Sequence, residues 1–347
     1  MPAELIVRKT GMLTSIQDLG RFGYRCYGVP WSGALHPDLV RIANVLVGNP
    51  QDSAVLETLV TGPVLEVVRG VLRIAVVGDA LIEIVRKDQS RLIRSWRSVT
   101  LEAGDLFKVK TVSRGRAAYL AFSGGISVPK VMGSRSTSVR GHLGGIDGSF
   151  LSVGDSLTCS ENSVPAGPEL NFPVNPLADI PYNHTRDLTS SFLEFRVILG
   201  PQQDYFSAES QRDFFQQEYQ IGSDSDRMGL RLEGNAVKHR SSAHREIVSD
   251  GMIPGAIQIP GNGLPIIMLA ESPTVGGYPK IATVISCDLP KLGILSPGQR
   301  IGFRPVNVDQ AETLLRQYRL GQAALLESVA PLTWLSDPFP ETGNQID

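Results

Sequence analysis

The stretch from residue 246 to residue 282 limits the fold most, because glycines and prolines interrupt it at short intervals. Two isoleucine-rich runs inside it, 256–259 and 265–270, are too short for helices and predict buried strands. Polar residues stand at the ends of these predicted strands: Ser249, Asp250, Gln258, Glu271, Ser272, Thr274 and Tyr278. Rigid strands that present such groups from tight turns can form a binding site. A tight all-β corner that binds nothing fits the same pattern.

Composition narrows the class of protein. The 347 residues predict about two domains. A net charge of −2, with lysines and arginines scattered along the chain, argues against nucleic-acid binding. No apolar run approaches the ~20 residues that span a bilayer, and the N-terminus lacks the apolar core of a signal peptide. Three widely spaced cysteines, Cys26, Cys159 and Cys287, predict a reducing compartment. We therefore expect a cytoplasmic protein that binds no membrane.

Short apolar runs separated by glycine or aspartate dominate the first half. Their spacing of roughly ten residues predicts an all-β barrel or sandwich. One helix is predicted over 37–48, with Pro37 in its first turn and Gly48 at its end. Glu57 lies within an apolar run, so it either faces outward or is a buried carboxylate with a role. The predicted strands cover 54–59, 64–68, 72–77, 81–85, 98–101, 106–109 and 117–123.

A second β-rich unit follows a segment that is rich in proline, asparagine and polar residues and predicts a linker. It begins with a predicted strand at 192–199. Residues 202–219 are predicted to form one helix or two turns, and a helix is predicted over 309–325. The sequence thus predicts a first domain over 1–165, a linker over 166–190, a second domain over 191–330 and an irregular tail over 331–347.

Three loops carry arginines among glycines and polar residues. Charge-assisted hydrogen bonds to an anion are typically worth about 1.5–3 kcal/mol each, so such loops suit a carboxylate or phosphate. Salt-bridged or solvated loops without a ligand are the alternative. The loops are 14–27 with Gln17, Asp18, Arg21 and Arg25, 133–145 with Ser134, Arg135, Ser136, Thr137, Ser138, Arg140 and His142, and 223–234 with Arg227 and Arg231.

Familiar catalytic signatures are missing from the sequence. It contains no P-loop, no G-x-G-x-x-G that opens a helix, and no G-x-S-x-G nucleophile elbow. The five histidines are dispersed and show no metal-ligand spacing. The residues alone therefore predict a two-domain β-rich protein with an anion site and no metal, and they name no reaction.

Seven motifs in order resemble one family, that of allophanate hydrolase subunit 2 and the 5-oxoprolinase C subunit, which is biotin-dependent carboxyltransferase-like and includes kinase-inhibitor antagonists. The resemblance implies a mostly β fold of two tandem cyclophilin-like β-barrels with a few short helices and a ligand cleft between them. The motifs are TSIQDLGRFGY (14–24), GVPWSGALHPD (28–38), ANVLVGN (43–49), GSRST (133–137), DRMGLRLEG (226–234), SDGMIPGAIQIPGNGLPI (249–266) and GGYPKIA (276–282).

The resemblance also implies an activity. A member of this kind would be the C subunit of an ATP-dependent 5-oxoprolinase, which opens 5-oxo-L-proline to L-glutamate. It would be active only as a complex with the A subunit and with a B subunit of the kinase-inhibitor type. The complex would consume ATP. Two alternatives stay open: a urea carboxylase-like carboxyltransferase component that uses biotin, and a non-catalytic regulator that binds a kinase-inhibitor-type partner.

Site residues follow from the same motifs. The resemblance implies that Arg135 and Arg227 clamp an anion, that Gln258 and Tyr278 bond the amide, and that the backbone of 276–277 donates N–H groups. Two departures from the family pattern are His36 and the run from Glu271 to Val275. The implied catalytic residues are Arg135, Arg227, Gln258 and Tyr278, and the implied substrate-binding residues are Asp18, Arg21, Ser32, Asn44, Ser136, Thr137, Arg231, Thr274, Gly276 and Gly277.

Overall fold

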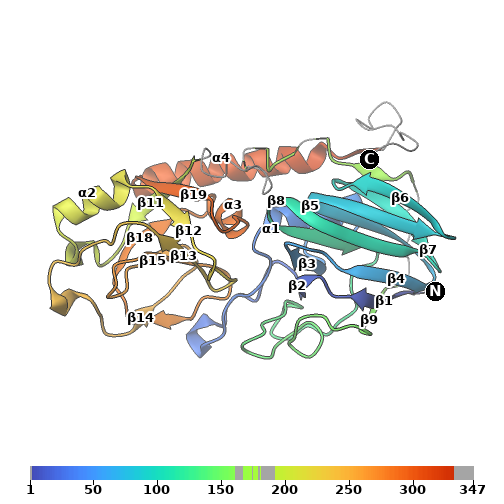
Figure 1. The fold of residues 1–347 in the computed structure, drawn as a ribbon, viewed down its shortest axis with the longest axis horizontal. Helices are drawn as coiled ribbons and strands as arrows, with labels where there is room; N and C mark the ends of the chain where they lie inside the picture. Colours follow the sequence, from blue (N-terminus) through green and yellow to red (C-terminus); the bar gives the residue numbers. More distant parts are fainter. Residues whose placement is uncertain (1, 161–166, 174, 179, 181–191, 332–347) are drawn as a thin grey trace.

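The computed structural model describes residues 2–160, 167–173, 175–178, 180 and 192–331. It is mostly β, as the sequence predicts, with two β-rich halves side by side (Figure 1). A long helix, α4 (Val308–Glu327), runs along the upper edge of both halves in that view. None of the described helices is long and apolar enough to cross a membrane.

The first half is an eleven-stranded sheet built on two long strands, β5 (Val71–Arg86) and β8 (Leu106–Phe122). These strands pair with each other, and β8 also pairs with β3 and β4, so the sheet branches. The other strands are β1 (Ala3–Lys9), β2 (Met12–Gln17), β3 (Val55–Leu59), β4 (Val64–Arg69), β6 (Gln89–Arg94), β7 (Arg97–Glu102), β9 (Ser156–Cys159), β10 (Leu170–Asn171) and β20 (Ala330–Pro331).

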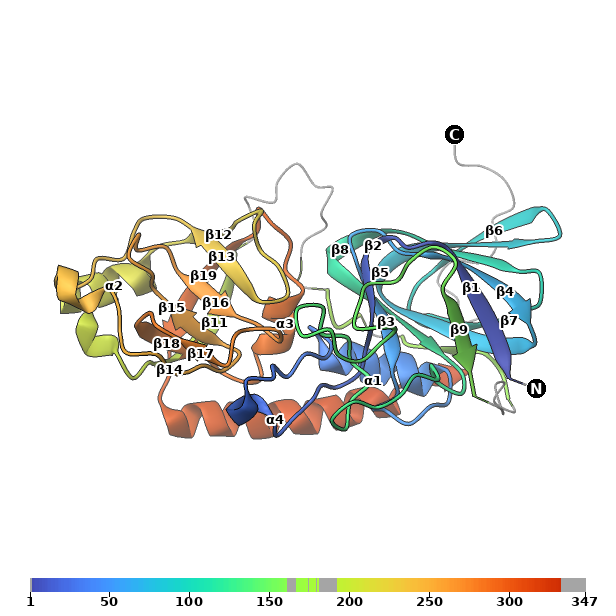
Figure 2. The same ribbon diagram turned by 90° about the horizontal axis from the view of Figure 1, so that it is seen from below.

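The second half is a closed seven-stranded barrel (Figure 2). Its apolar interior includes Ile257, Ile267 and Ile281, all fully buried. Helix α2 (Ala208–Gln216) covers one side, with Phe214 stacked on Phe303 at 4.9 Å between ring centroids. In order around the barrel, the strands are β11 (Phe192–Leu199), β18 (Lys280–Val284), β15 (Ala256–Gln258), β16 (Ile266–Met268), β13 (Gly229–Glu233), β12 (Tyr219–Ile221) and β19 (Arg300–Pro305).

Smaller elements connect and cover the two halves. Helix α1 (Pro37–Leu46) packs on β5 and β8, and the short α3 (Leu289–Gly293) follows the barrel strand β18. A separate two-stranded antiparallel sheet consists of β14 (Asp250–Gly251) and β17 (Val275–Gly276). Three 3₁₀ turns complete the described part: η1 (Arg25–Tyr27), η2 (Gln203–Tyr205) and η3 (Ser242–His244).

Several predicted elements are confirmed and others are wrong. The helices over 37–48 and 309–325 are α1 and α4, and the runs at 256–259 and 265–270 are β15 and β16. The glycine-punctuated pairs 72–77/81–85 and 106–109/117–123 are single strands, because Gly78 and Gly115 bend a strand instead of ending it. The start of the predicted loop 14–27 is part of β2.

The predicted linker contains ordered structure. Within it, β10 pairs with β7 and β20, and Phe172, Leu177 and Ile180 are buried apolar side chains in an otherwise polar segment. The division of the chain at residues 165, 190 and 330 stays a prediction. The predicted tail, from residue 332 onward, lies outside the described residues.

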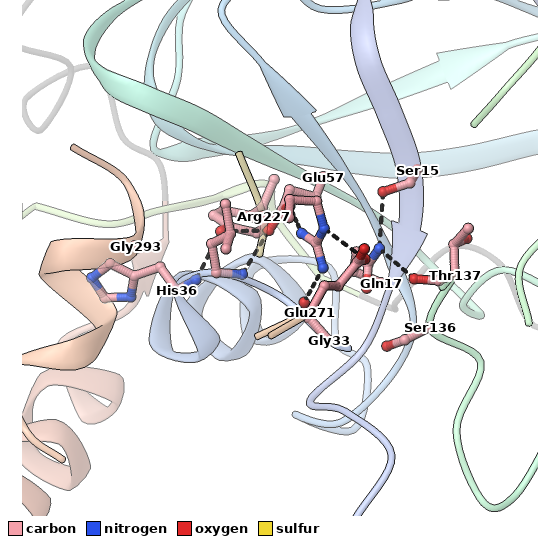
Figure 3. A network of polar contacts seen from close by, with 12 residues as sticks. Ser15, Gln17, Gly33, His36, Glu57, Ser136, Thr137, Arg227, Glu271 and Gly293 are labelled. Carbon is pink, nitrogen blue, oxygen red and sulfur yellow. Dashed lines mark hydrogen bonds and ion pairs between the residues drawn. The ribbon is translucent and has the colours of Figure 1, made fainter. Parts of the chain in front are cut away.

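A buried ion-pair network joins the two halves (Figure 3). Arg227, in the turn before β13, forms an ion pair with Glu57 of β3 and another with Glu271 at 2.9 Å. Its Nη2 donates to the Gly33 carbonyl at 2.6 Å. Glu57 also accepts bonds from the Leu35 N–H and the Tyr119 hydroxyl, both at 2.8 Å. Glu57 is 1% exposed, so the outward-facing interpretation of this residue is wrong.

Electrostatics keep Arg227 charged. Burial lowers the pKa of its guanidinium, but the charges of Glu57 and Glu271 outweigh burial and raise the pKa above its ordinary value. A second arginine, Arg116 of β8, also links the two halves. Its Nη2 and Nε donate to the Gly293 carbonyl at 3.1 and 3.2 Å, and its Nη2 donates to the Asp226 carbonyl at 3.2 Å. The two halves are therefore held together by fixed polar contacts as well as by apolar packing.

Removal of the shared arginine should destabilise the protein strongly. In Arg227→Met, two buried carboxylates lose their cation, a change that typically costs about 3–5 kcal/mol. The measurement is the free energy of unfolding in urea. Arg231→Met is the matched control, because Arg231 lies nearby on β13 but is exposed, and we expect a change within about 0.5 kcal/mol. Equal, small effects of the two substitutions would contradict the network's role.

The buried His36 should make the free energy of unfolding fall as the pH drops. Burial lowers its pKa from 6.5 to about 4 in the folded protein, with Asp38 opposing the shift and Lys291 adding to it. Below pH 6.5 the unfolded chain therefore binds more protons, and stability falls as pH drops towards about 4. We expect this group to account for a loss of about 2 kcal/mol between pH 7 and pH 5. His36→Gln should lack that part of the slope; an unchanged slope in urea titrations would refute the assignment.

Candidate functional site

Asp18 organises the loop that carries the GSRST motif. Its Oδ1 accepts bonds from the hydroxyls of Ser134 at 2.7 Å and Ser136 at 2.5 Å and from the Gly20 N–H at 2.9 Å. Its Oδ2 accepts the Arg135 N–H at 2.6 Å. The structure thus brings Asp18, Arg135 and Ser136 together. Because four protein donors already occupy this carboxylate, its geometry suits positioning of the loop.

The side chain of Arg21 contacts the same loop and is completely buried. Its Nε donates to the Val131 carbonyl at 2.9 Å and its Nη2 to the Ser136 carbonyl at 2.8 Å, but its Nη1 has no hydrogen-bond partner. Burial lowers the pKa of this guanidinium, and the charges of Asp18 and Glu271 oppose that shift. One donor of a buried cation therefore has no hydrogen-bond partner in the protein.

At two glycines the backbone lies close to the side chains of Arg21 and Thr137. A Cβ at Gly144 would lie 2.9 Å from Arg21 Nη2, and a Cβ at Gly145 would lie 2.1 Å from Thr137 Oγ1. The Thr137 hydroxyl is buried and has no partner. Beside it, the Gln17 amide nitrogen donates to the Thr137 carbonyl at 3.1 Å and to Ser15 Oγ at 2.9 Å (Figure 3). The Gln17 amide oxygen has no partner.

The second half contributes a further hydroxyl. Ser272 is completely buried, and its Oγ has no partner. Ser32 of the first half lies near it, since the Ser32 N–H donates to the carbonyl of Ala270 at 3.1 Å. Ser32 has a φ of 53°, a backbone conformation that non-glycine residues seldom adopt, and its buried Oγ also lacks a partner. Such strain is often retained at binding sites.

Five buried polar side chains with an unpaired atom thus lie along connected segments of both halves. We call this set the polar seam; it comprises Gln17, Arg21, Ser32, Thr137 and Ser272. Buried polar groups are normally paired, and an unpaired one costs about 1–3 kcal/mol. The seam offers a cation, three hydroxyls and an amide oxygen, a set that can bind a small molecule with an amide and an acid group.

A second cluster lies at one end of the barrel. The buried Gln258 amide donates to the Tyr278 carbonyl at 3.3 Å, and a Cβ at Gly276 would lie 2.6 Å from the same nitrogen, so a side chain there would displace the Gln258 amide. Lys280, 5% exposed, pairs with Asp250 and donates to the Gly251 carbonyl at 3.0 Å. The structure therefore brings Gln258, Gly276 and Tyr278 together and adds Lys280, which the sequence interpretation misses.

Arg25 connects the two clusters. Its Nη2 donates to the carbonyls of Met252 at 2.6 Å and Pro273 at 2.8 Å, and its guanidinium lies 5.6 Å from the centre of the Trp31 ring. The loop after β2 therefore contacts the polar seam through Arg21 and the barrel end through Arg25. The predicted site residues Thr274 and Gly277 lie at this end, where their carbonyls accept the N–H groups of Met252 and Ile247.

The remaining predicted site residues lie elsewhere. Asn44 is buried at the end of α1, where its amide donates to the Ser53 carbonyl at 2.8 Å. Arg231 is exposed on β13. Arg227 lies in the ion-pair network between the two halves, where each of its three guanidinium nitrogens donates to a protein oxygen. Among the described residues, no group of three or more His, Cys, Asp or Glu side chains is placed to hold a metal.

A groove of about 700 Å³ lies between α1 and α4. Asp38 lines it and pairs with Arg41 at 2.8 Å and with the Tyr318 hydroxyl. No predicted site residue and no member of the polar seam lines this groove. Its size alone therefore does not make it the site, because the unpaired buried polar atoms described above lie in other segments.

Comparisons with known proteins agree with the motifs. Residues 27–305 match the family model of the carboxyltransferase domain, subdomain A and B. The chain is 32% identical over 313 residues to the C subunit of 5-oxoprolinase from Escherichia coli, a match that covers 88% of this chain and 93% of that protein. It is 32% identical over 333 residues to the urea amidolyase of Saccharomyces cerevisiae, covering 90% of this chain and 17% of that protein.

A solved structure extends the likeness to three dimensions. The crystal structure of the Kluyveromyces lactis urea amidolyase superposes with a TM-score of 0.80 at 31% identity, covering 99% of this chain and 21% of that one. The chain thus corresponds to about a fifth of each urea amidolyase and to nearly all of the bacterial C subunit. It belongs to the carboxyltransferase-domain subdomain A and B family, and the predicted relationship to the 5-oxoprolinase C subunit is confirmed.

Proposed function

We propose that this chain is the C subunit of an ATP-dependent 5-oxoprolinase and that, together with the A and B subunits, it opens 5-oxo-L-proline to L-glutamate. The polar seam carries the proposal, because its unpaired groups suit a small ligand that has both an amide and a carboxylate. The match across 93% of the Escherichia coli 5-oxoprolinase C subunit favours this substrate among small amides. The cytoplasmic location stays part of the proposal.

The chemistry explains why the seam needs these groups. A lactam resists water until its oxygen is activated, and phosphate transfer from ATP to that oxygen would supply a leaving group. A first water would then add to the ring carbon so that the carbon–nitrogen bond breaks, and a second would release phosphate and leave glutamate. Throughout, the site must hold the substrate carboxylate and the charge that develops on oxygen.

Each seam residue has a task in this scheme. Arg21 Nη1 would bind the carboxylate, since a guanidinium keeps its proton at neutral pH. The Thr137 and Ser272 hydroxyls would donate to substrate oxygens, and the Gln17 amide oxygen would accept the lactam N–H. We assign ATP consumption to the complex and no ATP contact to a residue of this chain.

A second candidate is a carboxyltransferase component that works with carboxybiotin on a urea-type amide. The superposition over 99% of this chain on a urea amidolyase favours it. An amide-binding seam would serve either reaction, so the reaction itself must be assayed.

The test is glutamate formation from 5-oxoproline and ATP by the reconstituted complex. We expect Thr137→Val and Ser272→Ala each to lower kcat/KM at least about tenfold, the loss of roughly one substrate hydrogen bond. Because neither hydroxyl has a partner in the protein, the stability of both variants should stay within about 0.5 kcal/mol of wild type.

The matched control is Ser98→Ala. The Ser98 hydroxyl accepts the Leu170 N–H at 2.8 Å and donates to the Leu170 carbonyl at 3.3 Å, so this variant should lose about 1 kcal/mol of stability and keep its turnover. Wild-type turnover in both seam variants would exclude the seam as the substrate site. No glutamate, together with carboxyl transfer from carboxybiotin, would select the second candidate.

A further inference from the structure

The two carboxylate oxygens of Glu271 differ in their surroundings. Its Oε1 accepts the Arg227 Nε–H at 2.9 Å, whereas none of the residues that the structure describes donates to its Oε2. Glu57, the other carboxylate paired with Arg227, uses both of its oxygens. Its Oε1 accepts from Arg227, and its Oε2 accepts the Leu35 N–H and the Tyr119 hydroxyl. Glu271 is 9% exposed and Glu57 is 1% exposed, so Glu271 has a free acceptor that water can reach.

The backbone places Glu271 between the ion-pair network and the polar seam. Its N–H donates to the Arg227 carbonyl at 3.0 Å. The residue before it, Ala270, accepts the N–H of the seam residue Ser32 at 3.1 Å, and the residue after it is Ser272 of the seam. One chain neighbour of Glu271 therefore contacts the seam and the other belongs to it.

Two further seam residues lie near the Glu271 carboxylate. The charge of Glu271 acts on the buried guanidinium of Arg21, where it opposes the lowering of the pKa by burial. Gln17 of β2 bonds to Ser15, and Ser15 stands opposite Glu57 in the register of β2 and β3. These three side chains therefore share the side of the sheet that faces the ion-pair network (Figure 3). Glu271 thus lies among a cation and an amide of the seam.

Asp18, another buried carboxylate near the seam, is less suited to proton transfer. Its Oδ1 accepts three hydrogen bonds, from the GSRST loop and from Gly20, and its Oδ2 accepts the Arg135 N–H. Like Glu57, it could take a proton only by giving up a contact that fixes the backbone. A general base must lie within hydrogen-bond reach of the proton that it removes. Ser272, which holds a substrate oxygen in the proposed function, directly follows Glu271 and so keeps the substrate near this carboxylate.

We propose that Glu271 is the general base for ring opening at the polar seam. This inference rests on the proposed function, which supplies a lactam whose oxygen carries phosphate and whose ring carbon is doubly bonded to nitrogen. A water molecule on Glu271 Oε2 bonds to that carbon and gives a proton to the carboxylate. The electron pair of the double bond moves to the nitrogen, which then takes the proton from Glu271.

The carbon–nitrogen bond then breaks by the same route. Its electron pair stays on nitrogen, and the hydroxyl on the carbon becomes a carbonyl as its proton passes through Glu271 to the nitrogen. Both hydrogens of the water thus end on the new amino group, and the carboxylate returns to its starting form. The product is an acyl phosphate, which the second water converts to glutamate and phosphate. A carboxylate is a weak base, but it suffices because the phosphate already activates the ring carbon.

The test measures two products of the reconstituted complex, glutamate and ADP, for wild type and Glu271→Gln. Wild type should form them in equal amounts. In Glu271→Gln phosphate transfer continues but ring opening is slow, so water returns the phosphorylated lactam to 5-oxoproline and phosphate. We expect glutamate formation to fall at least about 100-fold and the ratio of glutamate to ADP at least about tenfold. Glu271→Asp, which keeps a carboxylate, should recover part of the ratio.

Glu57→Gln is the matched control. It removes the other negative partner of Arg227 but no free oxygen. It should therefore lower stability and leave the ratio of glutamate to ADP within about twofold of wild type. The ratio does not depend on the fraction of each variant that is folded, so a loss of stability alone does not change it.

Two results would overturn the role of Glu271: a wild-type ratio in Glu271→Gln, or an equal fall of the ratio in Glu271→Gln and Glu57→Gln. In both cases glutamate formation by wild type would still support the proposed function. No glutamate from wild type would contradict the proposed function, and the role of Glu271 with it. The wild-type reaction therefore distinguishes the two failures.

Discussion

The buried ion pair between Arg227 and Glu57 is the contact on which the arrangement of the two halves depends. Neither group can meet water, so each is tolerable only while the other is in place. The same guanidinium fixes the Gly33 carbonyl, and Glu57 fixes the Leu35 N–H, so the network also holds the backbone on either side of Ala34. That backbone sets Ser32 against Ala270, which is how hydroxyls from both halves come to lie in one seam.

Buried polar groups divide into two kinds in this protein. Asp18 is saturated by donors from its own loop and from the GSRST loop, and Arg227 donates from each nitrogen to a protein oxygen. Such groups hold segments in place. Gln17, Arg21, Thr137 and Ser272 are equally buried but keep an unpaired atom. An unpaired buried group lowers stability, and we propose that a ligand completes the hydrogen bonds of these four residues.

The sequence predicts local features and misses the non-local ones. Pro37 and Gly48 mark the limits of α1 because helix ends are set by neighbouring residues, and the isoleucine runs mark β15 and β16 for a similar reason. In the sequence, Gly78 predicts a turn that ends a strand. In the structure it lies at a register shift within β5, and such a bulge depends on the partner strand, which the local sequence does not show. The motifs indicate Asp18, Ser136 and Gln258, but the unpaired atoms of Gln17 and Ser272 depend on which groups the fold leaves without partners, and no sequence pattern records that.

The most direct measurement is a crystal structure of this chain with the B subunit and bound 5-oxoproline. We expect the ligand to lie within hydrogen-bond distance, about 3 Å, of Thr137 Oγ1 and Ser272 Oγ, with its carboxylate on Arg21 Nη1. Those three atoms would then all be paired. A ligand bound in the groove between α1 and α4, or at the barrel end with the seam atoms still unpaired, would exclude the polar seam as the substrate site.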